Sequence, residues 1–276
     1  MPSSRVCRYE DFHAPWYVQW AERLLLEPTN QDLHRPDRNI SRKAWEWCAI
    51  SAALQERDML QPGRQGLGFA VGTEPLSSMF ASKGVGVLAT DLEVDAATWS
   101  TTNDHAKSAE HLYHPNLIDR DTFDRNVRFQ AADMRDLASF KDESADFVWS
   151  SCSFEHLGSL EAGLRFVLEG MRLVKANGLA IHTTEFNVGS NDDTWDTGLN
   201  VIYRKRDIEE LGYRLRLVSS ALEQVDFDAG AHPYDIEYDY PPYFKHGRKH
   251  VKLLLGPHIS TSVLLVIRKG SVPHLR

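Results

Sequence analysis

The chain has 276 residues, with 31 basic against 39 acidic side chains and a formal net charge of −8. A nucleic-acid-binding protein normally presents a basic surface, so this balance argues against a nucleic-acid partner. No apolar run approaches the length of a membrane span, and three scattered cysteines are too few for a disulfide framework or a zinc cluster. We therefore expect a cytoplasmic globular protein with reduced cysteines.

Residues 1–62 are predicted to form an N-terminal helical extension that is rich in aromatic side chains. Trp16 and Trp20 are one helical step apart, and Ser41 is a suitable N-cap for a helix that runs to about Asp58. These helices either cover a substrate pocket or pack their tryptophans against the flank of a sheet. The packing interpretation is favoured.

Residues 66–91 have the pattern of a strand, a glycine turn, a helix and a second strand. Gly66–Val71 is short and apolar enough for a buried parallel strand, and Gly72 lets the backbone turn tightly and approach a ligand. A helix after Pro75 leads to a second buried strand, Val85–Thr90. Asp91 then lies about 20 residues after the glycine turn, where an acid in such units binds ribose hydroxyls.

Two other interpretations of this segment remain open. It is compatible with an ordinary βαβ unit whose glycines serve only the turn. A nicotinamide-dependent dehydrogenase shares the strand, turn, helix and acid, but the third glycine of its G-x-G-x-x-G fingerprint would fall on Val71. The rest of the chain must decide which cofactor is bound.

More strands are predicted downstream, at Val127–Met134, Asp146–Ser151 and Gly178–Thr184. Two apolar runs then close the chain, Val251–Leu255 and Val263–Ile267. The order and spacing of these elements resemble those of class I S-adenosylmethionine-dependent methyltransferases over about residues 63–269. The similarity is greatest to a bacterial branch that acts on small molecules and glycans.

The resemblance implies an α/β fold with a doubly wound, mostly parallel seven-stranded sheet and a C-terminal antiparallel strand pair, which a dinucleotide-binding dehydrogenase lacks. It implies a methyltransferase domain over residues 63–276, with acceptor-binding insertions near 186–200 and 229–249. It also implies S-adenosyl-L-methionine as the cofactor.

The family opens its cofactor site with an acid and three alternate glycines, whereas this chain has Gly68, Ala70, Gly72 and Glu74 at those places. Glu74 either replaces the missing acid or is a carboxylate that stabilises the start of a helix. By resemblance, Asp133 and the backbone of Met134 contact the adenine, and Ser151 lies near the methionine part. The predicted cofactor residues are Ala70, Gly72, Glu74, Asp91, Leu92, Asp133, Met134 and Ser151.

The expected function is methyl transfer to a hydroxyl of a small or glycan-like acceptor. Such a hydroxyl must lose its proton, and His156 and Glu185 are the predicted catalytic residues because both follow strands at the ligand-binding edge of the sheet. The alternative for His156, a histidine that starts the next helix and bonds to backbone, is favoured over the catalytic role. His182 is predicted to be a core histidine.

No metal-binding residue is predicted. Asp192, Asp193 and Asp196 form a local carboxylate cluster, but Ser-Asn-Asp-Asp-Thr is also an ordinary polar turn. The alternative functions are a catalytically inactive cofactor-binding module and, less favoured, a nicotinamide-dependent dehydrogenase. The sequence does not predict the oligomeric state.

Overall fold

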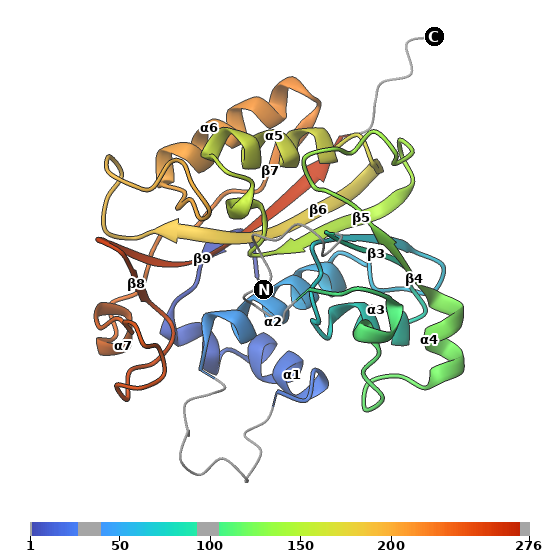
Figure 1. Ribbon diagram of the computed structural model, residues 1–276, viewed down its shortest axis with the longest axis horizontal. Coiled ribbons are helices and arrows are strands. Elements are labelled where there is room, and N and C mark those ends of the chain that lie inside the picture. Colours follow the sequence, from blue (N-terminus) through green and yellow to red (C-terminus); the bar gives the residue numbers. More distant parts are fainter. Residues whose placement is uncertain (1, 27–39, 93–104, 271–276) are drawn as a thin grey trace.

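The computed structural model describes residues 2–26, 40–92 and 105–270. In this part of the chain a nine-stranded mixed sheet is covered by helices on both faces (Figure 1). The central strands are parallel and lie in the order β4, β3, β2, β5, β6, with bounds Val127–Ala131, Gly86–Asp91, Gln65–Phe69, Ala145–Ser151 and Val174–Asn187. β9 (His258–Lys269) continues the sheet antiparallel to β6. The α/β class and the mostly parallel sheet are as the sequence predicts.

The sheet has nine strands in the described residues where seven were expected, because β9 pairs along both of its edges. One edge pairs with β6, and the other is shared by β8 (Leu253–Leu255), β1 (Arg5–Val6) and β7 (Ser220–Leu222). The predicted C-terminal antiparallel pair is present as the β8–β9 hairpin, in which Leu255 is opposite His258. The N-terminal segment therefore contributes a strand as well as helices.

Helices α1 (Pro15–Arg23), α2 (Arg42–Glu56), α3 (Leu76–Ser82) and α4 (Arg120–Asn126) lie on one face of the sheet, and α5 (Leu160–Gly170) and α6 (Lys205–Leu217) lie on the other (Figure 1). The described part also contains four single-turn elements, namely η1 (Tyr9–His13), η2 (Ala109–Leu112), η3 (Phe154–His156) and α7 (Pro233–Ile236). Ser41 caps α2 as predicted, because its Oγ accepts the N–H of Ala44 at 3.3 Å.

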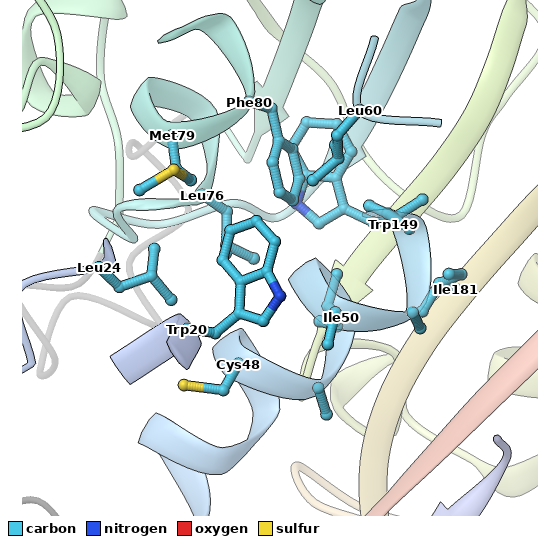
Figure 2. Close-up of a cluster of buried hydrophobic side chains, with 14 of the residues drawn as sticks. Trp20, Leu24, Cys48, Ile50, Leu60, Leu76, Met79, Phe80, Trp149 and Ile181 are labelled. Carbon is cyan, nitrogen blue, oxygen red and sulfur yellow. The ribbon is translucent and has the colours of Figure 1, made fainter. Parts of the chain in front are cut away.

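The aromatic side chains of the N-terminal helices belong to the core. Trp20 and Trp45 are 2% and 0% exposed. Figure 2 shows Trp20 of α1 near Leu24, Cys48 of α2 and Leu76 of α3. Trp149 of β5 lies beside Phe80 of α3 in the same cluster. Removing a buried aromatic side chain of this kind typically costs about 3–5 kcal/mol. Burial of these tryptophans agrees with the packing interpretation.

β6 is longer than the sequence predicts, and this places two polar residues differently. The strand was predicted to begin at Gly178, but it begins at Val174 and includes Lys175–Gly178, where Asn177 has φ +63° and the pairing with β5 shifts register between Ala145 and Phe147. An irregularity in the ladder thus absorbs the turn residues without ending the strand. At the other end, Glu185 and Asn187 were expected just beyond the strand but are within it, paired with β9.

Candidate functional site

The chain turns sharply at the carboxyl end of β2, where the sequence predicts the cofactor site. Ala70 and Gly72 have φ values of +48° and +53°. A positive φ costs glycine nothing but strains alanine, so Ala70 is held in this conformation by its surroundings. The turn directs the N–H of Gly72 toward Asp91 at the end of β3, with a distance of 3.1 Å from N to Oδ2.

Asp91 is 2% exposed and both of its oxygens accept hydrogen bonds. Oδ2 accepts the N–H groups of Gly72 and Ala106, while Oδ1 accepts the N–H of Leu92 and lies 3.2 Å from Nδ1 of His105. A carboxylate has about four lone-pair sites, so these contacts occupy all of them. Asp91 therefore braces the glycine turn, and ribose hydroxyls would have to replace contacts from His105 and Ala106.

Asp133 and Met134 lie past the end of β4, at the same edge of the sheet. The carboxylate of Asp133 accepts hydrogen bonds from Arg135, which lower its pKa below the usual value. Met134 is buried against the cluster on the α5 face. Leu92 follows Asp91 directly and is partly exposed.

The N-terminal part of α2 places three charged side chains, Arg42, Lys43 and Glu46, at the carboxyl edge of the sheet. Lys43 Nζ lies 3.1 Å from Glu74 Oε1 and 3.2 Å from Ser151 Oγ, and thus joins two predicted cofactor residues. Burial raises the pKa of Glu74, and Lys43 opposes this shift. Oε2 of Glu74 is buried without a hydrogen bond of standard geometry, so the site offers a carboxylate oxygen to a cationic group of a ligand.

Glu46 lies one turn further along α2 and is fully buried. Its Oε2 accepts a hydrogen bond from Ser151 Oγ at 3.1 Å, and its Oε1 accepts one from Ser262 and one from Cys152 Sγ at 2.9 Å. Burial alone would raise the pKa of Glu46, but Lys43 and Arg42 together lower it. Glu46 is therefore a buried anion held by cations of its own helix.

Arg42 connects this network to Glu185 on β6. The guanidinium donates a hydrogen bond to Glu185 Oε1 and another to Ser262 Oγ at 3.1 Å, and Ser260 donates to Glu185 Oε2. Glu155 of η3 is also fully buried, and its Oε2 accepts a hydrogen bond from Thr184 Oγ1 at 3.0 Å. One donor atom each from Cys152, Glu155 and Glu185 lies within 4.8 Å of the others.

His156 follows Glu155 at the end of η3. Its Nδ1 donates to the carbonyl of Leu199 at 3.0 Å, which ties η3 to the insertion near 186–200. This contact agrees with the structural alternative, a histidine that bonds to backbone. His182 is 1% exposed and Nδ1 lies 2.8 Å from Ser150 Oγ, so it is the core histidine that the sequence predicts.

The residue directly after the second insertion, near 229–249, contacts the start of α2. The carbonyl of His250 accepts the N–H of Arg42 at 2.8 Å. Burial raises the pKa of Tyr243, with a further increase caused by the charge of Glu185. The insertion therefore lies beside the Arg42–Glu185 ion pair.

Residues 67–182 match the family model described as a methyltransferase domain. This segment is a methyltransferase domain. The protein is accordingly a methyltransferase.

Solved structures agree on the fold. Magnesium protoporphyrin IX methyltransferase from Synechocystis PCC 6803, solved with bound S-adenosylhomocysteine, is 12% identical, with a TM-score of 0.52 over 95% of this chain and 97% of that chain. A protein from Galdieria sulphuraria described as a candidate sarcosine dimethylglycine methyltransferase is 14% identical, with a TM-score of 0.51 over 91% of this chain and 90% of that one. No curated protein sequence matches the chain.

Arg42, Lys43 and Glu46 of the methyltransferase were missed by the sequence reasoning. They lie in the segment predicted as a separate helical extension, yet they contact β5, β6 and β9. A usable signal was available: two adjacent cations and an acid directly follow the Ser41 cap on a helix that is otherwise apolar. Charges in the first turn of a buried helix require partners on a neighbouring element.

The acidic cluster after β6 behaves as the polar turn that the sequence favours. Ser190 Oγ accepts the N–H groups of Asp192 and Asp193, and Arg206 contacts the Asp192 carboxylate. These acids belong to none of the groups close enough to hold a metal ion in the described residues. Across the same residues, no helix combines the length and apolar character needed to cross a bilayer.

Proposed function

We propose that this methyltransferase transfers the methyl group of S-adenosyl-L-methionine to a hydroxyl of a small or glycan-like acceptor in the cytoplasm. The observation that carries the proposal is the buried charged network at the carboxyl edge of β5 and β6, bordered by both predicted acceptor-binding insertions. Net charge of −8 supports an acceptor other than nucleic acid. The three cysteines are present as thiols, which supports a reducing compartment.

On the cofactor side, we assign the ribose to Asp91 and Leu92 and the adenine to Asp133 and the backbone of Met134. The methionine part would contact the glycine turn, with Ala70, Gly72, Glu74 and Ser151 around it. When bound, the cofactor supplies an electrophilic methyl group on a sulfonium. The buried carboxylate of Glu74 suits the ammonium group of such a ligand, because burial strengthens the attraction between opposite charges.

On the acceptor side, we assign His156 and Glu185. Both oxygens of Glu185 already accept hydrogen bonds, from Arg42 and Ser260, so this carboxylate is suited to orient the acceptor. His156 is held by the Leu199 carbonyl at the border of the insertion, where an acceptor hydroxyl could reach the ring. Orientation of the nucleophile toward the methyl carbon supplies much of the rate in a displacement of this kind.

The cofactor assignment is tested by calorimetry with S-adenosylhomocysteine and the Asp91→Asn variant. One carboxylate oxygen becomes a donor, so we expect a loss of about 1–3 kcal/mol of binding free energy through unpaired buried groups. Asp124→Asn, an exposed change on α4, is the control, and circular dichroism checks the fold. If Asp91→Asn bound S-adenosylhomocysteine with unchanged affinity, the assignment of Asp91 would be contradicted. If the protein bound NADH tightly and did not bind S-adenosylhomocysteine, the assignment of the cofactor would be contradicted.

The acceptor assignment is tested by measuring S-adenosylhomocysteine release over a panel of hydroxylated small molecules and sugars. With an active acceptor, His156→Ala should retain cofactor affinity and lose about 100-fold or more in turnover, because the lost contact belongs to the transfer step. Near-normal turnover would make His156 structural and leave Glu185, tested by Glu185→Gln. Cofactor binding without turnover on any acceptor would favour the binding-module alternative.

A further inference from the structure

The charged network at the sheet edge contains more buried acid than base. Glu46, Glu155 and Glu185 are 0%, 0% and 4% exposed, and the cations that contact them are Arg42 and Lys43. The second of these cations also neutralises Glu74. A buried carboxylate without a positive partner is costly, so an excess of this kind indicates that a cation binds among these groups.

Glu155 is the acid of the network that forms no ion pair with Arg42 or Lys43 in the described residues; burial raises its pKa, and the charge of the neighbouring His156 opposes this shift. Oε2 accepts a hydrogen bond from the hydroxyl of Thr184, whereas Oε1 is fully buried and makes no hydrogen bond. A Glu155 oxygen lies within 4.8 Å of both a Glu185 oxygen and the sulfur of Cys152. The unsatisfied carboxylate therefore borders a cluster of three potential metal ligands from three different segments.

We propose that Cys152, Glu155 and Glu185 bind a divalent transition metal ion, with zinc as the best match. Cysteine sulfur and carboxylate oxygens are both zinc ligands, and one thiolate among oxygen donors favours zinc over magnesium or calcium. Three protein ligands with a further position open to a small molecule is the arrangement of a catalytic zinc site. The inference does not depend on which acceptor is methylated.

The surrounding groups are placed as outer partners of such a site. Thr184 orients Glu155, and Ser260 orients Glu185. Each carboxylate oxygen has two lone pairs, so Glu185 can keep the hydrogen bond from Arg42 and also coordinate a metal. The thiol of Cys152 donates to Glu46 at 2.9 Å from sulfur to Oε1. On metal binding the S–H bond breaks, a metal–sulfur bond forms, and the proton is released to the solvent.

The test uses the purified full-length protein after treatment with a chelator, with zinc and then cobalt as probes. We expect one zinc per chain by elemental mass spectrometry and a thiolate-to-cobalt charge-transfer band in the near-ultraviolet. Cys152→Ser should abolish the band, while Cys48→Ser, at a buried cysteine of the α1–α2–α3 core, should retain it. Thr184→Val, which removes a hydrogen bond to a ligand, should weaken zinc binding by about 10–100-fold. Glu155→Gln, which changes a ligand itself, should weaken zinc binding by at least as much.

Glu74→Gln is the matched control, because it removes a buried carboxylate at the same edge that does not belong to the three ligands. Its zinc affinity should equal that of the wild type. Thermal unfolding gives a second measurement. At the same zinc concentration, the midpoint of the wild type should rise by more than that of Glu155→Gln, whether or not the two proteins differ in basal stability.

Absence of stoichiometric zinc, or equal zinc affinity of the wild type and Cys152→Ser, would overturn the proposal. The proposal would also be overturned if ethylammonium raised the thermal midpoint of the protein and zinc did not. The buried carboxylates would then bind an amine ligand. Cofactor affinity, measured in the same samples by calorimetry, distinguishes these outcomes from a failure of the proposed function.

Discussion

Replacing Arg42 with methionine tests whether the charged network at the sheet edge holds α2 on the sheet. The Arg42 side chain is 15% exposed and forms an ion pair with Glu185, which is 5% exposed, and another with Glu46, which is 0% exposed. Burial opposes its charge, but Glu185, Cys152 and Glu46 overcome this and raise the pKa of Arg42 further. Methionine keeps most of the volume of the side chain and removes only its charge and donors.

Loss of one partner from a buried ion pair costs about 3–5 kcal/mol, because the remaining charge is left buried without compensation. With about 2–4 °C per kcal/mol for a chain of this size, the thermal midpoint should fall by about 6–20 °C. The assay is urea denaturation followed by circular dichroism, with the thermal midpoint as a second measurement. Arg120→Met, which removes an exposed arginine from its pair with Glu110, should leave both nearly unchanged.

A double-mutant cycle isolates the ion pair. In Arg42→Met/Glu185→Gln neither charge remains, so the double variant should be more stable than the sum of the two single losses predicts. Additive losses would refute the reasoning, and so would a loss below about 1 kcal/mol for Arg42→Met, the upper end for an exposed pair.

Two further predictions concern the core around the site. Gly68→Ala would place a Cβ 2.4 Å from the Trp149 side chain, and overpacking of this kind destabilises a protein by about 1–3 kcal/mol. The control is Gly170→Ala, whose new Cβ would have no atom within 4 Å. In the same urea titration it should be neutral or stabilising. Burial lowers the pKa of His182 to about 3 in the folded protein. In the unfolded chain the histidine pKa is about 6.5. Between these pH values the unfolded chain binds a proton at His182 and the folded protein does not. Stability should therefore fall as the pH drops from about 6.5 toward 3, and His182→Gln should lose this part of the dependence. An identical pH dependence of both proteins, or equal stabilities of the two alanine variants, would contradict these arguments.

The central strands could be predicted because parallel strands covered on both faces are short, continuous apolar runs bounded by glycine turns. Gly66–Val71 and Asp146–Ser151 agree with β2 and β5 to within two residues at each end. β1 and β7 have two and three residues, too few for any periodic pattern, and they exist because the exposed edge of β9 is long enough to pair with both. Such strands are a consequence of tertiary structure.

The predicted site residues share one property: each lies at the carboxyl end of a parallel strand, where the register of the sheet brings chain segments together. The strand order therefore predicts that Asp91 and Asp133 lie at the same edge of the sheet, as they do. In the structure, however, the Asp91 carboxylate already accepts hydrogen bonds from backbone N–H groups of the protein. The strand order could not reveal Glu46, which is separated from Cys152 by 106 positions along the chain. Only the packing of α2 across β5, β6 and β9 brings the two together.

The cost of burying charge explains why α2 belongs to the site. Residues 48–54 of this helix are buried without exception, so its middle is held by apolar packing, while its N-terminal part carries Arg42, Lys43 and Glu46 into the protein. Each charge would destabilise the fold if the sheet edge did not supply an opposite partner or a hydroxyl. A helix that served only as packing would have no physical need for these groups. The network is therefore best explained by a task at the sheet edge, which the methyl-transfer and metal-binding experiments address separately.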